Sequence, residues 1–365
     1  MNSNFDTDFK TILGKLDQID PIKYGSSRNY IHGAVTYLSP YISRGVISTK
    51  QVLESVLKKG YKVSQIESFV KELCWRDYFQ RVAQVKNLDV AIKQEQTPIA
   101  NNEISSLIVN AATGIEGIDN AIKQLYQTGY MHNHCRMYTA SLACNIAKSH
   151  WYHPAQWMSY HLLDGDWASN ACSWQWVAGA NSSKKYYTNQ ENINKYTRTN
   201  QRNTYLDKSY EEIEAMPSPT ALMDTQKFNL SLHLPETSHI LFTPGLPTFI
   251  YNYYNLDPLW HKDERGNRIL LIEPDFFAKY PVSQKCINFM LALSEHIKDI
   301  QIYTGSFQSF TRQYKATTIY YKEHPLNNGY TGKQEDRDWI TEEVTGYYPS
   351  FFAFWKKAEK HLILK

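Results

Sequence analysis

The sequence predicts a multi-domain protein of the α plus α/β class, in which an all-helical domain is followed by a small Rossmann-like domain with a parallel sheet. Three observations support this prediction. The 365 residues exceed what one ordinary core holds. Apolar residues recur at helical spacing from Phe9 to about residue 215, and short apolar runs follow beyond residue 238. We therefore expect domains at 1–214 and 239–365, joined by a linker at 215–238.

The helical part is predicted from the spacing of its apolar residues, most clearly at Phe9, Ile12, Leu13 and Leu16 and at Ile115, Ile118, Ile122 and Leu125. The stretch 128–145 is also expected to be a helix, beginning near Tyr130. It would place Asn133, Arg136, Met137 and Ala140 on one face. A buried Arg needs a carboxylate partner, which Asp164 or Asp166 could supply.

The linker is expected at 215–238, where three prolines and several Ser and Thr residues interrupt every periodic pattern. Beyond it, short apolar runs at 239–243, 268–274, 300–305 and 317–321 are typical of strands. A helical stripe at 282–298 separates two of these runs. Strand, helix and strand in this order indicate a parallel βαβ unit.

The composition limits the classes of function. A formal net charge of +3 is nearly balanced, so contact with nucleic acid requires a local basic face. Lys184, Lys185, Arg198 and Arg202, with tyrosines between them, are candidates, although a solvated charged surface explains them equally well. No apolar run approaches the roughly 20 residues that a membrane helix needs. We expect no contact with a membrane.

The five cysteines are scattered and show no CxxC spacing, which argues against both a disulfide framework and a zinc ribbon. We therefore expect a reducing, cytoplasmic location. Several histidines lie near Asp164 and Asp166 in the sequence and are possible metal ligands. However, His132 and His134 point about 200° apart on a helix, and no HxxxH or HExxH spacing occurs. The prediction is that no metal is bound.

Four segments form an ordered pattern. They are YGSSRNYIHGAVTYLSPYISRGVIS (24–48), ELCWRDYFQRV (72–82), TGIEGIDNAIKQLYQTGYMHNHCRM (113–137) and LLDGDWASNACSWQW (162–176). In this order the segments resemble the FAD-binding domain of the cryptochrome/photolyase family. The resemblance implies FAD as cofactor, a deoxyribodipyrimidine photolyase-like lyase as the activity, and damaged DNA as the partner.

The resemblance assigns the cofactor site. The residues matching the segment that cradles the FAD phosphates are Tyr24, Arg28, Thr36, Leu38 and Ser39. Arg136 and Asp164 match a salt bridge over the flavin ring, and Asp166 matches the acid near its polar edge. Asn170 matches the residue that faces flavin N5, where an amide suits reduced flavin because it adds no negative charge. Asn133 is included in the same set.

The resemblance also implies substrate and electron-transfer residues. Asn133, Met137 and Trp176 match residues that contact a flipped cyclobutane pyrimidine dimer, Trp176 by stacking. Asp77 stands where the family has a substrate-binding Glu, and Gln80 where it has a second stacking Trp.

Trp174 and Trp151 match the first two members of the family's tryptophan chain, which passes electrons inward to the flavin. The third member has no Trp in the corresponding region, 91–102. A tyrosine could end the chain.

Two alternatives to repair remain open on these residues. One is a cryptochrome-like photosensor that binds FAD and signals through a partner, which Asp77, Gln80 and the missing third Trp favour. The other is a helical interaction protein without flavin, which the retention of Arg136 and Asp164 disfavours. The C-terminal part resembles a reduced photolyase antenna domain placed after the helical domain, with an unrelated α/β domain as the alternative. No antenna chromophore follows from the sequence.

Overall fold

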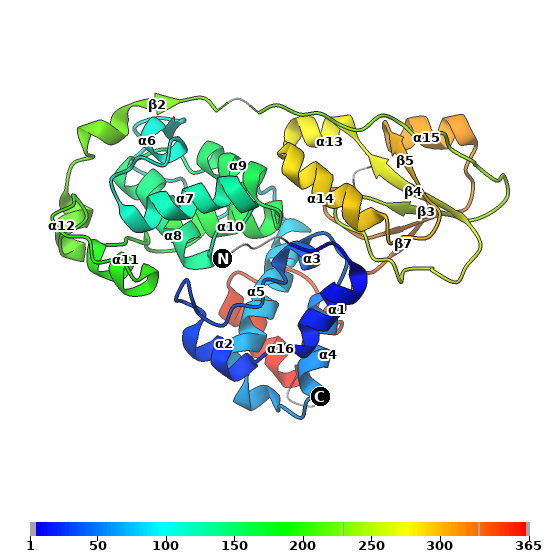
Figure 1. The fold of residues 1–365 in the computed structure, drawn as a ribbon, viewed down its shortest axis with the longest axis horizontal. Coiled ribbons are helices and arrows are strands. Elements are labelled where there is room, and N and C mark those ends of the chain that lie inside the picture. The colour runs from blue at the N-terminus through cyan, green and yellow to red at the C-terminus, as the bar shows by residue number, and fades with distance from the viewer. Residues whose placement is uncertain (1–4, 229, 328, 363–365) are drawn as a thin grey trace. The chain divides into compact units, whose positions relative to one another are not determined.

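The computed structural model describes residues 5–228, 230–327 and 329–362 (Figure 1). The chain divides into two compact units by its internal contacts. Unit 1 contains residues 20–35 and 86–230, and unit 2 contains residues 5–19, 36–85 and 231–365. No described helix is long and apolar enough to cross a membrane.

Unit 1 is almost entirely helical. Its elements are α2 (Pro21–Ser27), α6 (Ser106–Val109), α7 (Glu116–Thr128), α8 (Asn133–Ser141), the π-helical turn η2 (Leu142–Ile146), α9 (Tyr152–His161), α10 (Trp167–Ala178), α11 (Gln190–Thr197), α12 (Tyr210–Ala215) and the 3-10 turn η3 (Thr220–Met223), with the short antiparallel strands β1 (Ile104–Ser105) and β2 (Thr225–Gln226). Because β2 pairs with β1, the segment expected to be a linker contributes to the fold of unit 1.

Unit 2 combines helices from the first part of the chain with the α/β part. The helices and turns are α1 (Phe9–Asp17), α3 (Ser39–Ser43), α4 (Thr49–Leu57), η1 (Val63–Gln65), α5 (Glu67–Ala83), α13 (Pro274–Lys279), α14 (Gln284–Ser294), α15 (Phe307–Tyr314) and α16 (Phe351–Leu362). The strands of its sheet are β3 (Thr248–Tyr251), β4 (Asn267–Ile272), β5 (Ile300–Thr304), β6 (Ile319–Lys322) and β7 (Lys333–Glu335).

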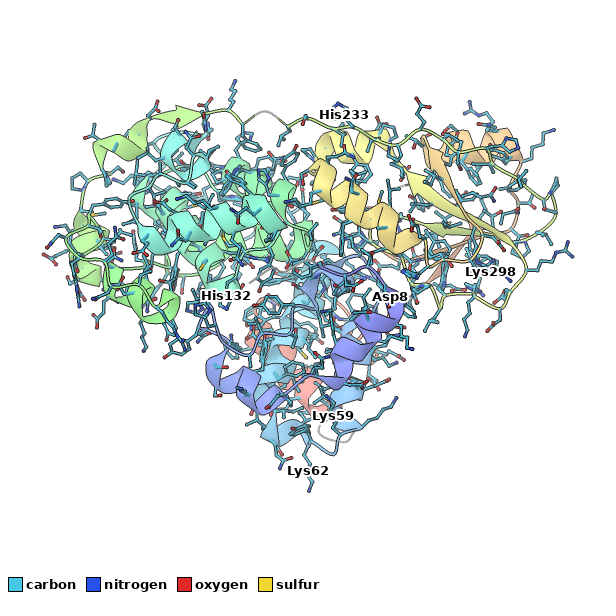
Figure 2. All side chains as sticks on the ribbon, viewed as in Figure 1. Asp8, Lys59, Lys62, His132, His233 and Lys298 are labelled. Carbon is cyan, nitrogen blue, oxygen red and sulfur yellow. The ribbon has the colours of Figure 1, made fainter. Side chains whose placement is uncertain are left out.

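The first helix shows how side chains set the ends of an element. The Oδ2 atom of Asp8 accepts a hydrogen bond from the backbone N–H of Thr11 at 2.8 Å, which caps the N-terminus of α1. At the other end the Lys59 ammonium donates to three carbonyl oxygens, those of Leu16, Asp17 and Ile19. These carbonyls lie at or just beyond the C-terminus of α1, where a positive charge is favourable. Figure 2 labels Asp8 and Lys59.

The sheet is parallel throughout, in the order β5-β4-β3-β6-β7. The chain adds β4 and β5 on one side of β3 and then returns to place β6 on the other side. The order therefore reverses between β3 and β6, the position where open α/β sheets usually bind ligands. Every residue of β4 is buried, as expected for a central parallel strand covered on both faces. The prediction of a parallel sheet is confirmed.

One strand was predicted at the wrong place. Residues 239–243 form no strand. Beside them, Ser238 donates its backbone N–H to the carbonyl of Ile302 at 3.0 Å, and the N–H of Ile302 is satisfied by the Ser238 hydroxyl. The segment thus lies along edge strand β5 and is held there by both side-chain and backbone hydrogen bonds. It does not form the regular backbone hydrogen bonds of a paired strand. The first strand of the parallel sheet is β3, whose run Thr248–Tyr251 is fully buried.

The compact units do not follow the expected boundary near residue 214. Helix α16, from the C-terminal part, packs on α5, and the rings of Trp75 and Phe351 stack with centroids 3.8 Å apart. The guanidinium of Arg44 lies 3.4 Å from the ring centroid of Tyr253 in the loop after β3. Residues 36–85 therefore share a core with the α/β part.

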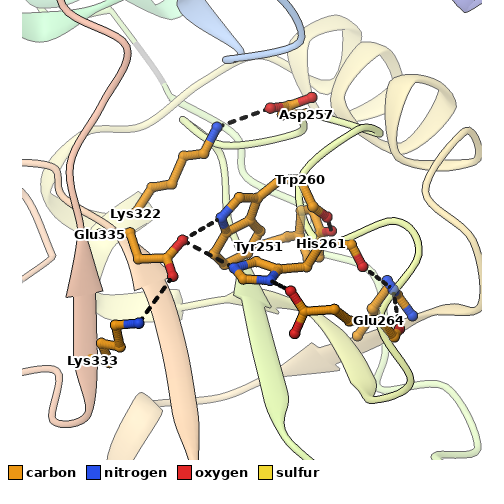
Figure 3. A network of polar contacts seen from close by, with 9 residues as sticks. Tyr251, Asp257, Trp260, His261, Glu264, Lys322, Lys333 and Glu335 are labelled. Atoms are coloured by element: carbon orange, nitrogen blue, oxygen red, sulfur yellow. Dashed lines mark hydrogen bonds and ion pairs between the residues drawn. The ribbon is translucent and has the colours of Figure 1, made fainter.

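A polar network joins edge strand β7 to the loop that follows β3 (Figure 3). The carboxylate of Glu335 accepts a hydrogen bond from Trp260 Nε1 at 2.8 Å, and its Oε2 atom lies 3.0 Å from His261 Nε2. Burial raises the pKa of Glu335, but these two contacts outweigh it and lower the pKa overall. Lys322 of β6 pairs with Asp257 at 2.9 Å. The contacts of Glu335 thus tie the short last strand β7 to the loop after β3.

Candidate functional site

Helices α8 and α10 of unit 1 carry part of the predicted cofactor and substrate site, namely Asn133, Arg136 and Met137 on α8 and Asn170 and Trp176 on α10. Helix α8 begins at Asn133, three residues later than expected, because His132 Nδ1 accepts the backbone N–H of His134 and caps the helix. It continues into the π-helical turn η2. Such turns are rare and frequently occur at functional sites. The accessible side of α8 carries Asn133, Arg136 and Met137.

Helix α10 packs against α8 and begins directly after Asp166. The Asp166 carboxylate accepts from the N–H and the hydroxyl of Ser169, at 3.3 and 2.7 Å, and is the N-cap. Gly179 ends the helix at a φ of 80°, the left-handed conformation that favours glycine. The accessible side of α10 carries Ser169, Asn170, Ser173 and Trp176.

The predicted partner of Arg136 is present. Its Nη2 atom donates to Asp164 Oδ2 at 2.8 Å, and its Nε donates to the carbonyl oxygen of Met131 at 2.8 Å. The Asp164 side chain is 5% exposed and that of Arg136 is 23% exposed. A carboxylate this buried depends on its cation, because removing one partner of a buried pair leaves an uncompensated charge.

The amide of Asn170 has a fixed orientation. Its Nδ2 atom donates to the carbonyl oxygen of Ala155 in α9 at 2.8 Å. A group that approaches from the accessible side of α10 would therefore meet the amide oxygen, which accepts hydrogen bonds. The side chain is suited to a ligand that presents an N–H.

Two histidines beside this surface are neutral at pH 7. Burial, aided by neighbouring positive charge, lowers the pKa of both His132 and His134 to about 4. Neither side chain then adds positive charge next to Arg136. No group of three or more His, Cys, Asp or Glu side chains with metal-binding geometry occurs among the described residues.

The five residues predicted for phosphate binding fall in both compact units. Tyr24 lies in α2 and Arg28 is its C-cap, both in unit 1. Thr36, Leu38 and Ser39 lie in unit 2, where the Thr36 hydroxyl accepts the N–H of Leu38 at 3.4 Å. Unit 1 therefore positions Tyr24 and Arg28, and unit 2 positions the other three residues.

The tryptophans of unit 1 differ sharply in exposure. Trp151 and Trp174 are 0% and 2% exposed, whereas Trp176 is 40% exposed. The Trp176 ring lies 5.8 Å from that of Tyr186. Trp167, for which the sequence predicted no role, lies 6.5 Å from Trp151 between ring centroids. The feature of the sequence that could have indicated a role for Trp167 is its position directly after Asp166 in the ordered motif.

Asp77 and Gln80, on α5 of unit 2, are both 5% exposed. Asp77 accepts from the Thr49 hydroxyl at 2.7 Å and from the backbone N–H of Ile340 at 2.8 Å. Gln80 accepts from Arg337 Nη1 at 2.6 Å. Both side chains thus hold the segment 337–341, which follows the sheet. Arg337 was not predicted from the sequence, because nothing in its local pattern indicates a contact with α5.

These contacts predict a structural effect of Asp77. Burial, partly offset by its two hydrogen bonds, raises the pKa of Asp77 above the ordinary value of 3.8. The folded protein therefore binds the proton of the Asp77 carboxyl more tightly than the unfolded chain does. The resulting contribution to the free energy of unfolding is complete below pH 3.8 and is lost as the pH rises through the folded pKa. In Asp77→Asn the free energy of unfolding should fall less over this pH range. Asp77→Ala should destabilise the protein by about 1–3 kcal/mol, because the Ile340 N–H loses its acceptor.

Urea unfolding at several pH values between 4 and 7 tests this prediction, with the exposed Asp263→Ala as the control. Equal destabilisation by Asp77→Asn and Asp77→Ala, with the pH dependence of the wild type, would contradict it.

Comparison with known proteins gives a consistent set of relatives. Residues 69–236 match the family model described as the FAD binding domain of DNA photolyase. A deoxyribodipyrimidine photo-lyase of Vibrio cholerae is 28% identical over 193 residues, which cover 49% of this chain and 41% of that protein. A cryptochrome DASH of Ostreococcus tauri is 29% identical over 187 residues, covering 48% of this chain and 33% of that protein.

Among solved structures, a cryptochrome of Synechocystis sp. PCC6803 aligns with a TM-score of 0.47 and 23% identity, covering 60% of this chain and 49% of that chain. The chain thus spans less than half the length of each of these relatives.

Proposed function

Because this chain carries an FAD-binding domain of the cryptochrome/photolyase family, with FAD as its cofactor, we propose that it splits cyclobutane pyrimidine dimers in DNA by light-driven electron transfer. The proposal rests on one observation above the others. Trp176 is a large aromatic ring that is 40% exposed on α10, on the same helix as Asn170. An exposed ring with no packing role in the core is suited to stack on a flipped base.

The residues of unit 1 fit a reduced flavin by the chemistry of their polar groups. Asn170 offers an acceptor oxygen to the N–H that reduced flavin has at N5. Arg136, held by Asp164, would offer a fixed positive charge to a ring that gains negative charge. The neutral His132 and His134 leave Arg136 as the cation of this surface on α8. When bound and reduced, FAD supplies one electron under blue light and takes it back after the ring of the dimer has opened.

The protein's own contribution is binding and orientation. Trp176 would stack on one pyrimidine of the dimer, and Asn133 and Met137 on the accessible side of α8 would contact its polar and apolar edges. The exposed Lys184 and Arg202 of the same unit would contact phosphates. Asn170 would hold the flavin so that the electron leaves toward the dimer.

The second candidate is a photosensor that binds FAD without repairing DNA. The contacts of Asp77 and Gln80 favour it, because both side chains are committed to the segment 337–341 and a flipped base would have to compete with these contacts. We rank repair first because Trp176, Met137 and Asn133 remain accessible.

The test is illumination of the reduced, FAD-loaded protein with an oligonucleotide that contains one thymine dimer. We expect light-dependent loss of the dimer, and none in the dark. Trp176→Ala should weaken binding of the damaged oligonucleotide by about 1–3 kcal/mol, the value of one stacked base. Tyr210→Ala, which removes another exposed ring of unit 1, should leave binding unchanged. Bound FAD without any loss of the dimer would favour the photosensor.

A further inference from the structure

Trp167 and Asp89 form a pair that the proposed repair function does not use. Trp167 is the first residue of α10 and is 4% exposed. Its Nε1 atom donates to Asp89 Oδ1 at 2.9 Å. Asp89 lies in unit 1, in the loop that follows α5. It is only partly buried, so its carboxylate is within reach of water.

The neighbouring Trp151 has the opposite environment. It is fully buried, and its Nε1 atom is buried without a hydrogen-bond partner among the described residues. Its ring centroid lies 6.5 Å from that of Trp167, with the ring planes 32° apart. Two indoles this close exchange an electron readily. The two rings differ, however, in how each can stabilise the positive charge that the exchange leaves on it.

The two rings differ in whether the Nε1 proton has an acceptor. An indole that has lost an electron is far more acidic at Nε1 than the neutral ring, and it can release the proton only to an acceptor within hydrogen-bond distance. Trp151 has no such acceptor among the described residues and stays a buried cation, which is costly in an apolar environment. Trp167 has a carboxylate in contact. The positive charge is therefore stabilised at Trp167 and not at Trp151.

We propose that Trp167 is the outer member of the electron path in this protein and that Asp89 accepts its proton. The inference rests on the proposed function, because the light-excited oxidised flavin is the oxidant. Trp174 gives one electron to the flavin, Trp151 gives one to Trp174, and Trp167 gives one to Trp151. Trp167 then transfers its Nε1 proton to Asp89 and remains as a neutral radical. A small thiol in solution returns one electron to Trp167, and a proton returns to Nε1.

This assignment accounts for the missing third tryptophan. The region 91–102 has no Trp, and Trp167 lies beside Trp151 by packing and not by sequence order. Tyr152 is the competitor, because its ring centroid lies 5.5 Å from that of Trp151 and 5.7 Å from that of Trp167. Its hydroxyl receives a hydrogen bond from Gln156 at 3.2 Å.

The experiment uses the full-length, FAD-loaded protein and four variants. Trp167→Phe removes the outer donor, Asp89→Asn keeps a hydrogen-bond acceptor of the same shape but a much weaker base, and Tyr152→Phe removes the competitor. Trp157→Phe is the matched control, because Trp157 is equally buried in unit 1 and its Nε1 also donates to a side-chain oxygen, that of Tyr126 at 3.1 Å. Photoreduction with a thiol and transient absorption of tryptophan radicals are measured.

We expect Trp167→Phe to slow photoreduction and to abolish the long-lived neutral radical. Asp89→Asn should form the initial radical normally but shorten its lifetime, because the charge returns before a proton is lost. Trp157→Phe and Tyr152→Phe should behave as the wild type. Wild-type radical lifetimes in both Trp167→Phe and Asp89→Asn would overturn the proposal, as would loss of the radical in Tyr152→Phe alone.

A second measurement does not depend on the flavin. One-electron oxidation of the FAD-stripped protein by azide radicals should give a neutral tryptophan radical in the wild type and less of it in Asp89→Asn, as seen by electron paramagnetic resonance. Equal yields in the two proteins would count against proton transfer to Asp89. If Trp174→Phe slows photoreduction but Trp167→Phe does not, only this inference fails. If the protein binds no FAD, the proposed function fails instead.

Discussion

The Arg136→Ala protein is expected to be purified without FAD. The change removes the cation that the buried Asp164 contacts at 2.8 Å and the positive charge proposed to lie over the flavin ring. Breaking a buried ion pair from one side costs about 3–5 kcal/mol, and the partial exposure of Arg136 places the effect on folding at the lower end of this range. The measurement is the ratio of flavin to protein absorbance after purification, followed by titration with FAD.

A double variant separates binding from folding. Arg136→Ala with Asp164→Asn removes the unpaired charge as well, so it should regain much of the lost stability while still failing to bind FAD. Arg202→Ala removes an exposed arginine of the same unit and serves as the control. Full FAD occupancy in Arg136→Ala would show that the pair is structural and has no part in the cofactor site.

The second large effect is expected from Trp174→Phe. Trp174 is 2% exposed on α10, and the proposal makes it the residue that gives the first electron to the flavin. A phenyl ring is much harder to oxidise than an indole, so photoreduction should slow by an order of magnitude or more while FAD remains bound. The measurement is the rate at which oxidised flavin absorbance disappears under blue light with a thiol.

Loss of packing must be distinguished from loss of the electron donor. Trp157→Phe removes the same atoms from another buried position of unit 1, so both variants should lose similar thermal stability. Only Trp174→Phe should slow photoreduction. An unchanged rate in Trp174→Phe, with FAD bound, would remove this residue from the electron path.

The local features of this fold could be predicted from the sequence. The helical spacing around Ile118 and Ile122 predicted α7, and the apolar runs at 268–274 and 300–305 predicted β4 and β5. The error at 239–243 has a physical cause, because apolar composition does not distinguish a strand from an extended segment beside a sheet edge. The burial of β3 depends on β4 and β6 on both sides of it, which a local pattern does not report.

The candidate site was predictable to a similar extent. The pairing of Arg136 with a carboxylate follows from the cost of burying an unpaired charge, and the resemblance selected Asp164. The contacts of Asp77 with Ile340 and of Gln80 with Arg337 join residues about 260 positions apart, so no local pattern reports them. The likeness of the C-terminal part to an antenna domain stays a prediction, as does the role of each site residue toward FAD.

The composition of unit 2 has a consequence for synthesis on the ribosome. The ring of Trp75 on α5 stacks on Phe351 of α16, which is made about 280 positions later in the chain. At about 5–20 residues per second, this delay lasts tens of seconds. During this time the apolar side of α5 lacks its final cover, while most of unit 1, from residue 86 to 230, has already emerged. Residues 36–85 therefore complete their core only when the last part of the chain has been made.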